Sequence, residues 1–168
     1  MPEDEVTERA HKDKEEGKSP STQAGEFVRE EMHHIREGKH GARSPQQAIA
    51  IGLSKARRAG VDLKAPQRGK ATSRVRAQAQ RDLKKGKSSS HRPPSQVRSR
   101  ATTNALKREG HSAASTESLS RQGHRAAQKR GKKSRQNSAR RAVKTKGSAG
   151  LRAAGQKAAR TRARHRSA

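Results

Sequence analysis

The chain has 168 residues, with 42 Lys and Arg against 15 Asp and Glu, and a formal net charge of +27. Only 26% of the residues are hydrophobic, Phe27 is the single Phe, Tyr or Trp residue, and cysteine is absent, which excludes disulfides, cysteine-based zinc sites and thiol catalysis. Low hydrophobicity with a high net charge is typical of disordered chains, because little apolar surface can offset the entropy of folding. Composition therefore predicts a mostly disordered chain with all-α elements.

Residues 1–20 form an acidic segment without an apolar run, so we expect a disordered head and no signal peptide. Two interpretations of this head stay open. It is either a solubilising segment, or it folds back on the basic residues further along and competes weakly, and only at low salt, with their partner. No stretch of the chain approaches the roughly 20 apolar residues of a membrane span.

The next segment, residues 21–63, is predicted to be a helical hairpin. Its first helix is expected to begin near Ser21 or Thr22 and to end at Glu37, before Gly38 as a left-handed stop. Five apolar residues follow the spacing of one helical face: Ala24, Phe27, Val28, Met32 and Ile35.

The second helix of the hairpin carries start and stop signals. Ser44 is a natural N-cap, Pro45 suits the first helical position, and Gln47 stands where a capping box needs it. Gly60 is expected to end the helix, with Val61 packing back on the last turn. The predicted inner stripe is Ala48, Ile49, Gly52, Leu53 and Ala56.

Gly52 in this stripe predicts a close approach of the two helix backbones. A unit of about forty residues is marginally stable alone. Ile51 lies outside the stripe, so it is expected to meet solvent or a second partner. The sequence therefore predicts a homodimer or a protein partner at the hairpin.

The hairpin region also carries a family resemblance. Residues 26–60, EFVREEMHHIREGKHGARSPQQAIAIGLSKARRAG, resemble a small bacterial domain of unknown function whose second helix reads Gln-Ala-Ile-Ala-Ile-x-Leu-Ser-x-Ala-Arg-x-Ala-Gly. The resemblance implies no established activity. The remainder is similar in character to the basic tails of linker histones and bacterial histone-like proteins, although arginine outnumbers lysine here.

Residues 64–168 are predicted to be a basic low-complexity tail. Its helix-capable segments are separated mostly by glycines, and each has one or two large apolar residues, too few to hold a helix by packing in water. These segments are 72–85, 95–109, 116–130, 133–146 and 151–164. KKGKSSSHRPPS, residues 84–95, is predicted to be a loop from its composition.

The charge is divided unevenly between the two parts of the chain. Residues 1–44 have a net charge of −3 and residues 45–168 a net charge of +30, which indicates a polyanionic partner. We expect non-specific, charge-driven binding of nucleic acid, DNA rather than RNA, by a cytoplasmic, nucleoid-associated or histone-like protein. The candidate binding residues are Lys55, Arg57, Arg58, Lys64, Arg68, Lys70, Lys129, Arg130, Lys132, Lys133, Arg135, Arg140, Arg141, Lys144 and Lys146.

Other ways of binding nucleic acid have less support in the sequence. Aromatic side chains on which single-stranded bases could stack are missing. A helix-turn-helix would need a third packing helix, which the pattern does not provide. The competing function is that of a protein-interaction or stress-associated adaptor, in which the hairpin binds a partner and the tail binds RNA or keeps the protein in solution.

Catalytic, metal and cofactor sites are not expected. No nucleophile–base pattern appears, so the chain is not predicted to be an enzyme. His33, His34 and His40 lie near Glu30 and Glu37, and Glu30 and His34 at i, i+4 could supply two metal ligands. An HExxH motif is missing, so surface histidines paired with glutamates are the preferred interpretation. No membrane partner is expected.

Overall fold

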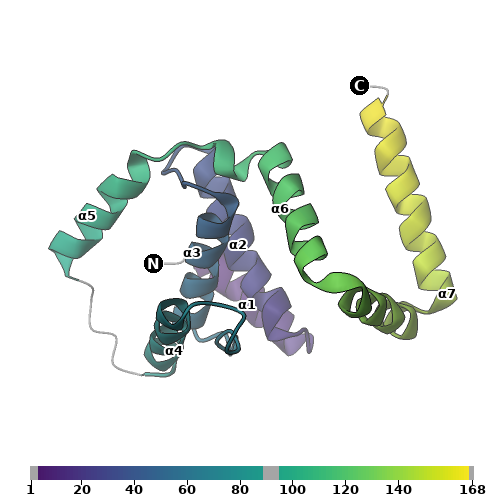
Figure 1. Cartoon of the computed structure of the whole chain (residues 1–168), viewed down its shortest axis with the longest axis horizontal. Coiled ribbons are helices and arrows are strands. Elements are labelled where there is room, and N and C mark those ends of the chain that lie inside the picture. Colours follow the sequence, from purple (N-terminus) through teal and green to yellow (C-terminus); the bar gives the residue numbers. More distant parts are fainter. Residues whose placement is uncertain (1–3, 89–94, 167–168) are drawn as a thin grey trace. The chain divides into compact units, whose positions relative to one another are not determined.

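The computed structural model describes residues 4–88 and 95–166. These described residues are 78% helical and contain no strand. The helices are α1 (Asp4–Glu15), α2 (Pro20–Arg36), α3 (Pro45–Arg58), α4 (Ser73–Lys87), α5 (Gln96–Lys107), the 3-10 turn η1 (Ser112–Ala114), α6 (Thr116–Lys129) and α7 (Gly131–Arg166) (Figure 1). The chain divides into two compact units, Met1–Gln122 and Gly123–Ala168.

The expectation of a mostly disordered chain with a short hairpin is wrong. The first unit is a packed assembly of helices, and much of its buried apolar surface is alanine: Ala10, Ala24, Ala42, Ala48, Ala56, Ala79, Ala113 and Ala114. Alanine has the highest helix propensity and loses no side-chain entropy on burial. An estimate based on large apolar residues alone therefore understates what this chain can bury.

The acidic head, expected to be disordered, forms α1 and packs on α2. Val6 and Ala10, one turn apart, lie in a buried cluster with Ala24 and Phe27 of α2. Arg9 extends from α1 and donates to Glu26 at 3.0 Å. Complete burial of a Phe or Val side chain contributes roughly 1.5–3 kcal/mol. Packing on α2 therefore stabilises α1, which its helix propensity alone would not keep folded.

Helices α2 and α3 lie side by side as the predicted antiparallel pair (Figure 1). A Cβ at Gly52 would stand 2.7 Å from the Val28 Cα, so only glycine permits this spacing. Gly38 follows α2 with a φ of 75°, and the Lys39 amide donates to the His34 carbonyl at 3.0 Å. The close approach and the left-handed stop are both confirmed.

The ends of α3 follow the sequence signals. The Ser44 hydroxyl accepts from the Gln47 amide at 3.3 Å, although the Gln47 side chain accepts from the Arg43 amide at 2.8 Å and so closes a variant of the expected box. At the other end the Val61 amide donates to the Ala56 carbonyl at 3.1 Å. This bond is part of a Schellman motif, which needs a left-handed residue after the helix, and Gly60 adopts that conformation with a φ of 93°.

The core extends beyond the predicted hairpin in both directions along the chain. Helix α4 packs on α3 through the buried Ala79 and Asp82. Ala113 and Ala114 of η1 are buried with Ile35 of α2. Ile51 is half-buried, and the dimer predicted at this residue stays a prediction.

Hydrogen bonds join the segment after α5 to the end of α2 and to the turn between α2 and α3. The Ala42 amide donates to the Gly110 carbonyl at 3.0 Å, and the Arg36 side chain donates to the Ala114 carbonyl at 2.9 Å. Of the loop predicted over 84–95, residues 84–87 continue α4, and 89–94 lie outside the described residues.

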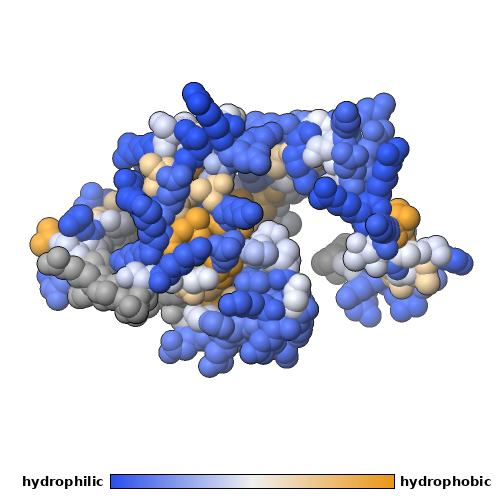
Figure 2. Space-filling model, turned by 90° about the horizontal axis from the view of Figure 1, so that it is seen from below, coloured by the Kyte–Doolittle hydropathy of each residue, from blue (hydrophilic) through white to orange (hydrophobic). Residues whose placement is uncertain are grey.

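The second unit consists of the end of α6 and the whole of α7. Gly147, with φ 65° and ψ 178°, interrupts α7, so the predicted segments 133–146 and 151–164 lie on either side of a kink. No residue in the described part of α7 is buried. Figure 2 shows one face of the whole molecule, on which hydrophilic side chains cover most of the surface and apolar side chains gather in a central patch and a few smaller ones.

Candidate nucleic-acid interface

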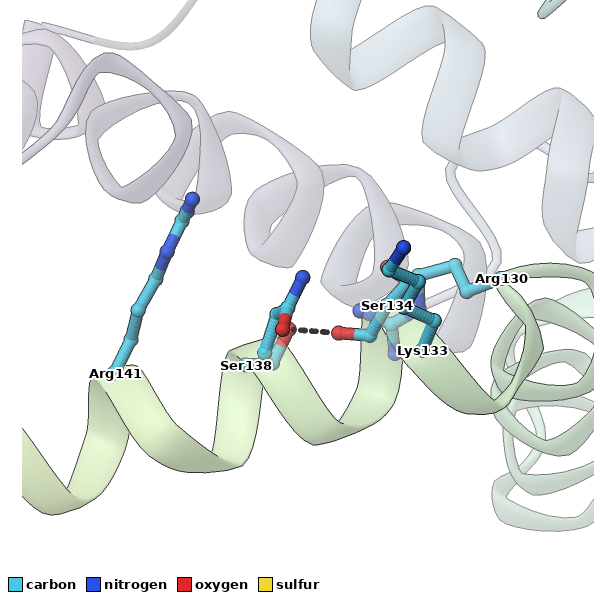
Figure 3. Close-up of a pocket in the computed structure, with 6 residues that line it drawn as sticks. Arg130, Lys133, Ser134, Ser138 and Arg141 are labelled. Carbon is cyan, nitrogen blue, oxygen red and sulfur yellow. Dashed lines mark hydrogen bonds between the residues drawn. The ribbon is translucent and has the colours of Figure 1, made fainter.

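A row of polar and cationic side chains follows one side of α7 before the kink. Its members, which we call the α7 strip, border one shallow and open depression: Arg130, Lys133, Ser134, Asn137, Ser138 and Arg141 (Figure 3). From Lys133 to Arg141 the spacing of three and four residues places the members on one helical face, and Arg130 lies in the turn just before α7. Because all six come from consecutive turns of one segment, the depression is a stretch of helix surface and not an enclosed cavity.

The strip offers both charge and hydrogen-bond donors. Three of its members are cations: Arg130, Lys133 and Arg141. The last two lie eight residues apart on α7, or about 12 Å at 1.5 Å per residue. Between them lie Ser134, Asn137 and Ser138, and the Ser138 hydroxyl donates back to the Ser134 carbonyl at 3.1 Å (Figure 3). Figure 3 also shows the Arg141 side chain extended away from the helix axis.

The electrostatic setting of the strip follows from composition. Residues 123–168 contain 16 Lys and Arg and no Asp or Glu, so the second unit has no acidic side chain to neutralise these cations. All the predicted binding residues in this part of the chain are exposed: Lys129, Arg130, Lys132, Lys133, Arg135, Arg140, Arg141, Lys144 and Lys146.

The helical period divides these cations between two faces of α7. At 3.6 residues per turn, Arg140 and Lys144 fall on the side of the α7 strip, together with Lys133 and Arg141. The remaining cations of the helix before the kink fall on the opposite side: Lys132, Arg135 and Lys146. The two faces therefore carry the same kinds of charge, but only the first combines them with a run of small hydrogen-bonding side chains.

Some predicted residues of the first unit are also exposed. Lys64, Arg68 and Lys70 lie on the segment between α3 and α4. Arg58, at the end of α3, is exposed and donates through Nε to the Ser54 carbonyl at 3.2 Å. These four side chains are accessible to a ligand.

Two other predicted residues, Lys55 and Arg57, are engaged inside the fold. Lys55 Nζ lies 2.6 Å from the carboxylate of the fully buried Glu31. Arg57 is 8% exposed and donates through Nε to the Leu63 carbonyl at 3.0 Å. Burial lowers the pKa of Arg57, and the carboxylate of Asp82 offsets part of this effect. Both side chains stabilise the helix pairing, so we leave them out of the candidate interface.

Two groups of residues were not identified from the sequence as sites. Ser134, Asn137 and Ser138 of the α7 strip are uncharged, so the distribution of charge does not identify them. Their i, i+3/i+4 spacing is nevertheless visible in the sequence. The second group is Glu31, His34 and His40, whose side chains gather inside the first unit. Of the histidines and glutamates weighed as ligands, His33 is exposed and Glu37 pairs with Lys39 at 3.2 Å.

Comparisons with known proteins identify no relative of this chain. Within the part of the chain that the structure describes, no helix has the length and apolarity needed to cross a bilayer. No family model, curated protein or solved structure matches the chain.

Proposed function

We propose that the protein binds nucleic acid without sequence preference, and duplex DNA in particular, through the α7 strip and the cations on the same face of α7. The observation that supports this proposal best is an exposed helix face of several cations in a unit that has no carboxylate. Ion pairs with Asp or Glu side chains of this unit therefore cannot satisfy these charges, whereas a polyanion can.

The chemistry of the strip suits phosphate rather than base edges. Lys and Arg that neutralise phosphates release condensed counterions, which supplies most of the affinity in non-specific binding. Serine hydroxyls and asparagine amides are common additional contacts to the phosphodiester backbone. The described helices offer no aromatic platform, in keeping with the amino-acid composition, so stacking on single-stranded bases is not part of the proposal.

The first unit has a different part in this proposal. Its helices bury their apolar side chains and tie up Lys55 and Arg57, so it contributes fewer accessible cations per residue than α7. We assign it the role of a folded anchor for a protein contact or a second copy. A histone-like, nucleoid-associated role and the resemblance to a small bacterial domain fit this division and remain proposals with it.

Two sets of substitutions on α7 test the proposed face. The triple variant K133Q/R141Q/K144Q neutralises two lysines and one arginine on the face of the strip, and K132Q/R135Q/K146Q neutralises the same residue types on the opposite face. Net charge and composition change equally. We expect the first set to weaken binding to a fluorescent duplex, measured by anisotropy at 100 mM salt, at least fivefold more than the second.

The outcomes separate the competing functions. Equal losses from the two sets would show that total charge and not the strip carries binding. If the unsubstituted chain fails to bind duplex DNA even at low salt, the proposal is refuted, and the adaptor function becomes the better explanation. A stronger response to structured RNA than to duplex DNA would contradict the preference for DNA.

A further inference from the structure

The geometry points to a zinc-binding site inside the first unit, formed by Glu31 and His34 of α2 and by His40 in the turn that follows. One ligand atom of each side chain lies within 4.8 Å of the others. Two imidazoles and a carboxylate are an established ligand set for Zn²⁺. This inference does not rest on the proposed binding of nucleic acid.

The first observation is a buried carboxylate with one unsatisfied oxygen. Glu31 is fully buried, and its Oε1 has no hydrogen-bond partner. The other oxygen, Oε2, is 2.6 Å from Lys55 Nζ. A buried charged oxygen without a hydrogen bond is costly, so Oε1 is where an additional cation would be stabilised most.

The second observation concerns the tautomer of His40. Its Nδ1 lies 3.1 Å from the Gly41 carbonyl oxygen, and a carbonyl can only accept, so Nδ1 carries the proton. In the neutral ring, Nε2 then presents its lone pair. That atom lies 3.2 Å from Oε1 of Glu31 without the alignment of a hydrogen bond. A neutral His40 therefore presents a lone pair to this carboxylate oxygen, and a cation shared between the two atoms would satisfy both.

The third observation is support from the neighbouring side chains. Nε2 of His34 lies 3.0 Å from Oε1 of Glu30, the contact by which outer carboxylates orient a ligating imidazole. The Gly41 carbonyl does the same for His40. The rings of His34 and His40 are edge to face, with centroids 6.1 Å apart, so two nitrogens can converge on one ion without stacking.

The distances fit a tetrahedral ion after a small closure. Zn–N and Zn–O bonds of about 2.0–2.2 Å place neighbouring ligand atoms about 3.3–3.5 Å apart. The pair from Glu31 and His40 is already at 3.2 Å, and all three ligand atoms lie within 4.8 Å of one another, so no pair must close by more than about 1.5 Å. His40 lies outside the helices, so the turn can supply this movement, and water fills the fourth position.

Lys55 opposes the metal and thereby provides a test. Its ammonium group holds Oε2 of Glu31 and repels a nearby dication, so Zn²⁺ binding is expected to be moderate, with a Kd in the micromolar range. Removing that charge in K55M leaves the histidines unchanged. We expect this variant to bind Zn²⁺ at least threefold more tightly.

The experiment titrates the full-length protein with zinc chloride against a chromophoric chelator at pH 7.5, without nucleic acid. We expect one ion per chain, and a loss of at least tenfold in affinity for H40Q and for E31Q. The matched control is H33Q, which changes an exposed histidine on the same helix and should stay within twofold of the unsubstituted chain. Zn²⁺ should also raise the melting temperature of the protein but not of H40Q.

Several results would overturn the inference. Affinity that is unchanged in H40Q, or reduced equally in H33Q, would show binding by scattered surface histidines. No stoichiometric binding at 100 µM Zn²⁺ would show that His40 and Glu31 form only an ion pair. If E31Q loses helical circular dichroism because the buried site is disrupted, H40Q and K55M decide the question.

Discussion

Ser54 on α3 donates a 2.7 Å hydrogen bond to the carboxylate of Asp82 on α4, a residue that is 5% exposed. Gln78 donates to the other oxygen at 3.1 Å, and Arg58 lies 3.8 Å away. Asp82 is therefore the polar centre of the α3–α4 contact. The helix after the predicted hairpin is fixed by a hydrogen-bond network as well as by the burial of Ala79.

Removing the carboxylate of Asp82 should destabilise the protein. We expect D82A to lower the free energy of unfolding by about 1–3 kcal/mol, because Ser54 and Gln78 would lose their shared acceptor. The matched control is D62N, since Asp62 forms only an exposed ion pair with Lys87 at 3.3 Å and should change stability by less than about 0.5 kcal/mol. Urea unfolding followed by circular dichroism measures both, and equal effects would contradict the role given to Asp82.

Glycines on the two central helices should respond in opposite directions to alanine. G52A places a Cβ 2.7 Å from the Val28 Cα, so α2 and α3 must move apart at a cost of about 1–3 kcal/mol. G25A meets no atom within 4 Å, and it should stabilise α2 by about 0.5–1 kcal/mol through helix propensity. Thermal melts of the two variants check the prediction, and a neutral G52A would show that the backbones are not in close contact.

Helix α1 should contribute to the stability of the first unit. We expect V6A to cost about 1–3 kcal/mol, because Val6 is 1% exposed and its shortening leaves a cavity beside Phe27. The exposed neighbour Glu8 provides the control E8Q, expected to change stability by less than about 0.5 kcal/mol. A disordered head would give no difference between the two variants in a urea titration.

The turn between α2 and α3 should depend on Gly41. A Cβ there would clash with the Glu109 carbonyl oxygen, whereas one at Gly110 would meet nothing within 4 Å. We expect G41A, but not G110A, to separate this turn from the segment after α5. Hydrogen exchange reports the result, because the Ala42 amide, bonded to the Gly110 carbonyl at 3.0 Å, should lose its protection in G41A alone.

Salt dependence gives a measure of the phosphate contacts made by the α7 strip. Each neutralised phosphate on B-DNA contributes about −0.9 to the slope of log affinity against log salt concentration. K133Q/R141Q/K144Q should therefore flatten the slope by about 2.7, if all three side chains touch phosphate. The opposite-face variant K132Q/R135Q/K146Q should leave the slope nearly unchanged between 50 and 200 mM salt. A slope equal to that of the unsubstituted chain in the first variant would contradict direct contact.

Local chemistry explains why part of the fold was predictable. Ser44, Pro45, Gly38 and Gly60 act within one or two turns of the chain, so their effect on the ends of α2 and α3 does not depend on distant residues. The small side chain of Gly52 likewise indicated a close helix contact. In the candidate interface, exposed cations such as Lys133 and Arg141 were predictable because clustered charge without carboxylates cannot be buried.

Other parts of the fold and of the candidate sites could not be predicted from the sequence, because they depend on which surfaces pack together. Val6 and Ala10 make an apolar stripe too thin to predict a stable helix until Phe27 covers it. Lys55 and Arg57 look like accessible cations in the sequence, yet packing directs one to Glu31 and buries the other. The meeting of Glu31, His34 and His40 likewise requires the turn after α2 to fold back.

The sequence by itself determined the ends of the two central helices and the concentration of positive charge toward the C-terminal half, because capping and charge are properties of neighbouring residues. Tertiary structure alone decided that α1, α4 and η1 join α2 and α3 in one packed unit, and which cations remain exposed. The physical reason is that burial requires two surfaces. An alanine-rich helix surface stabilises the fold only when another helix comes close enough to cover it.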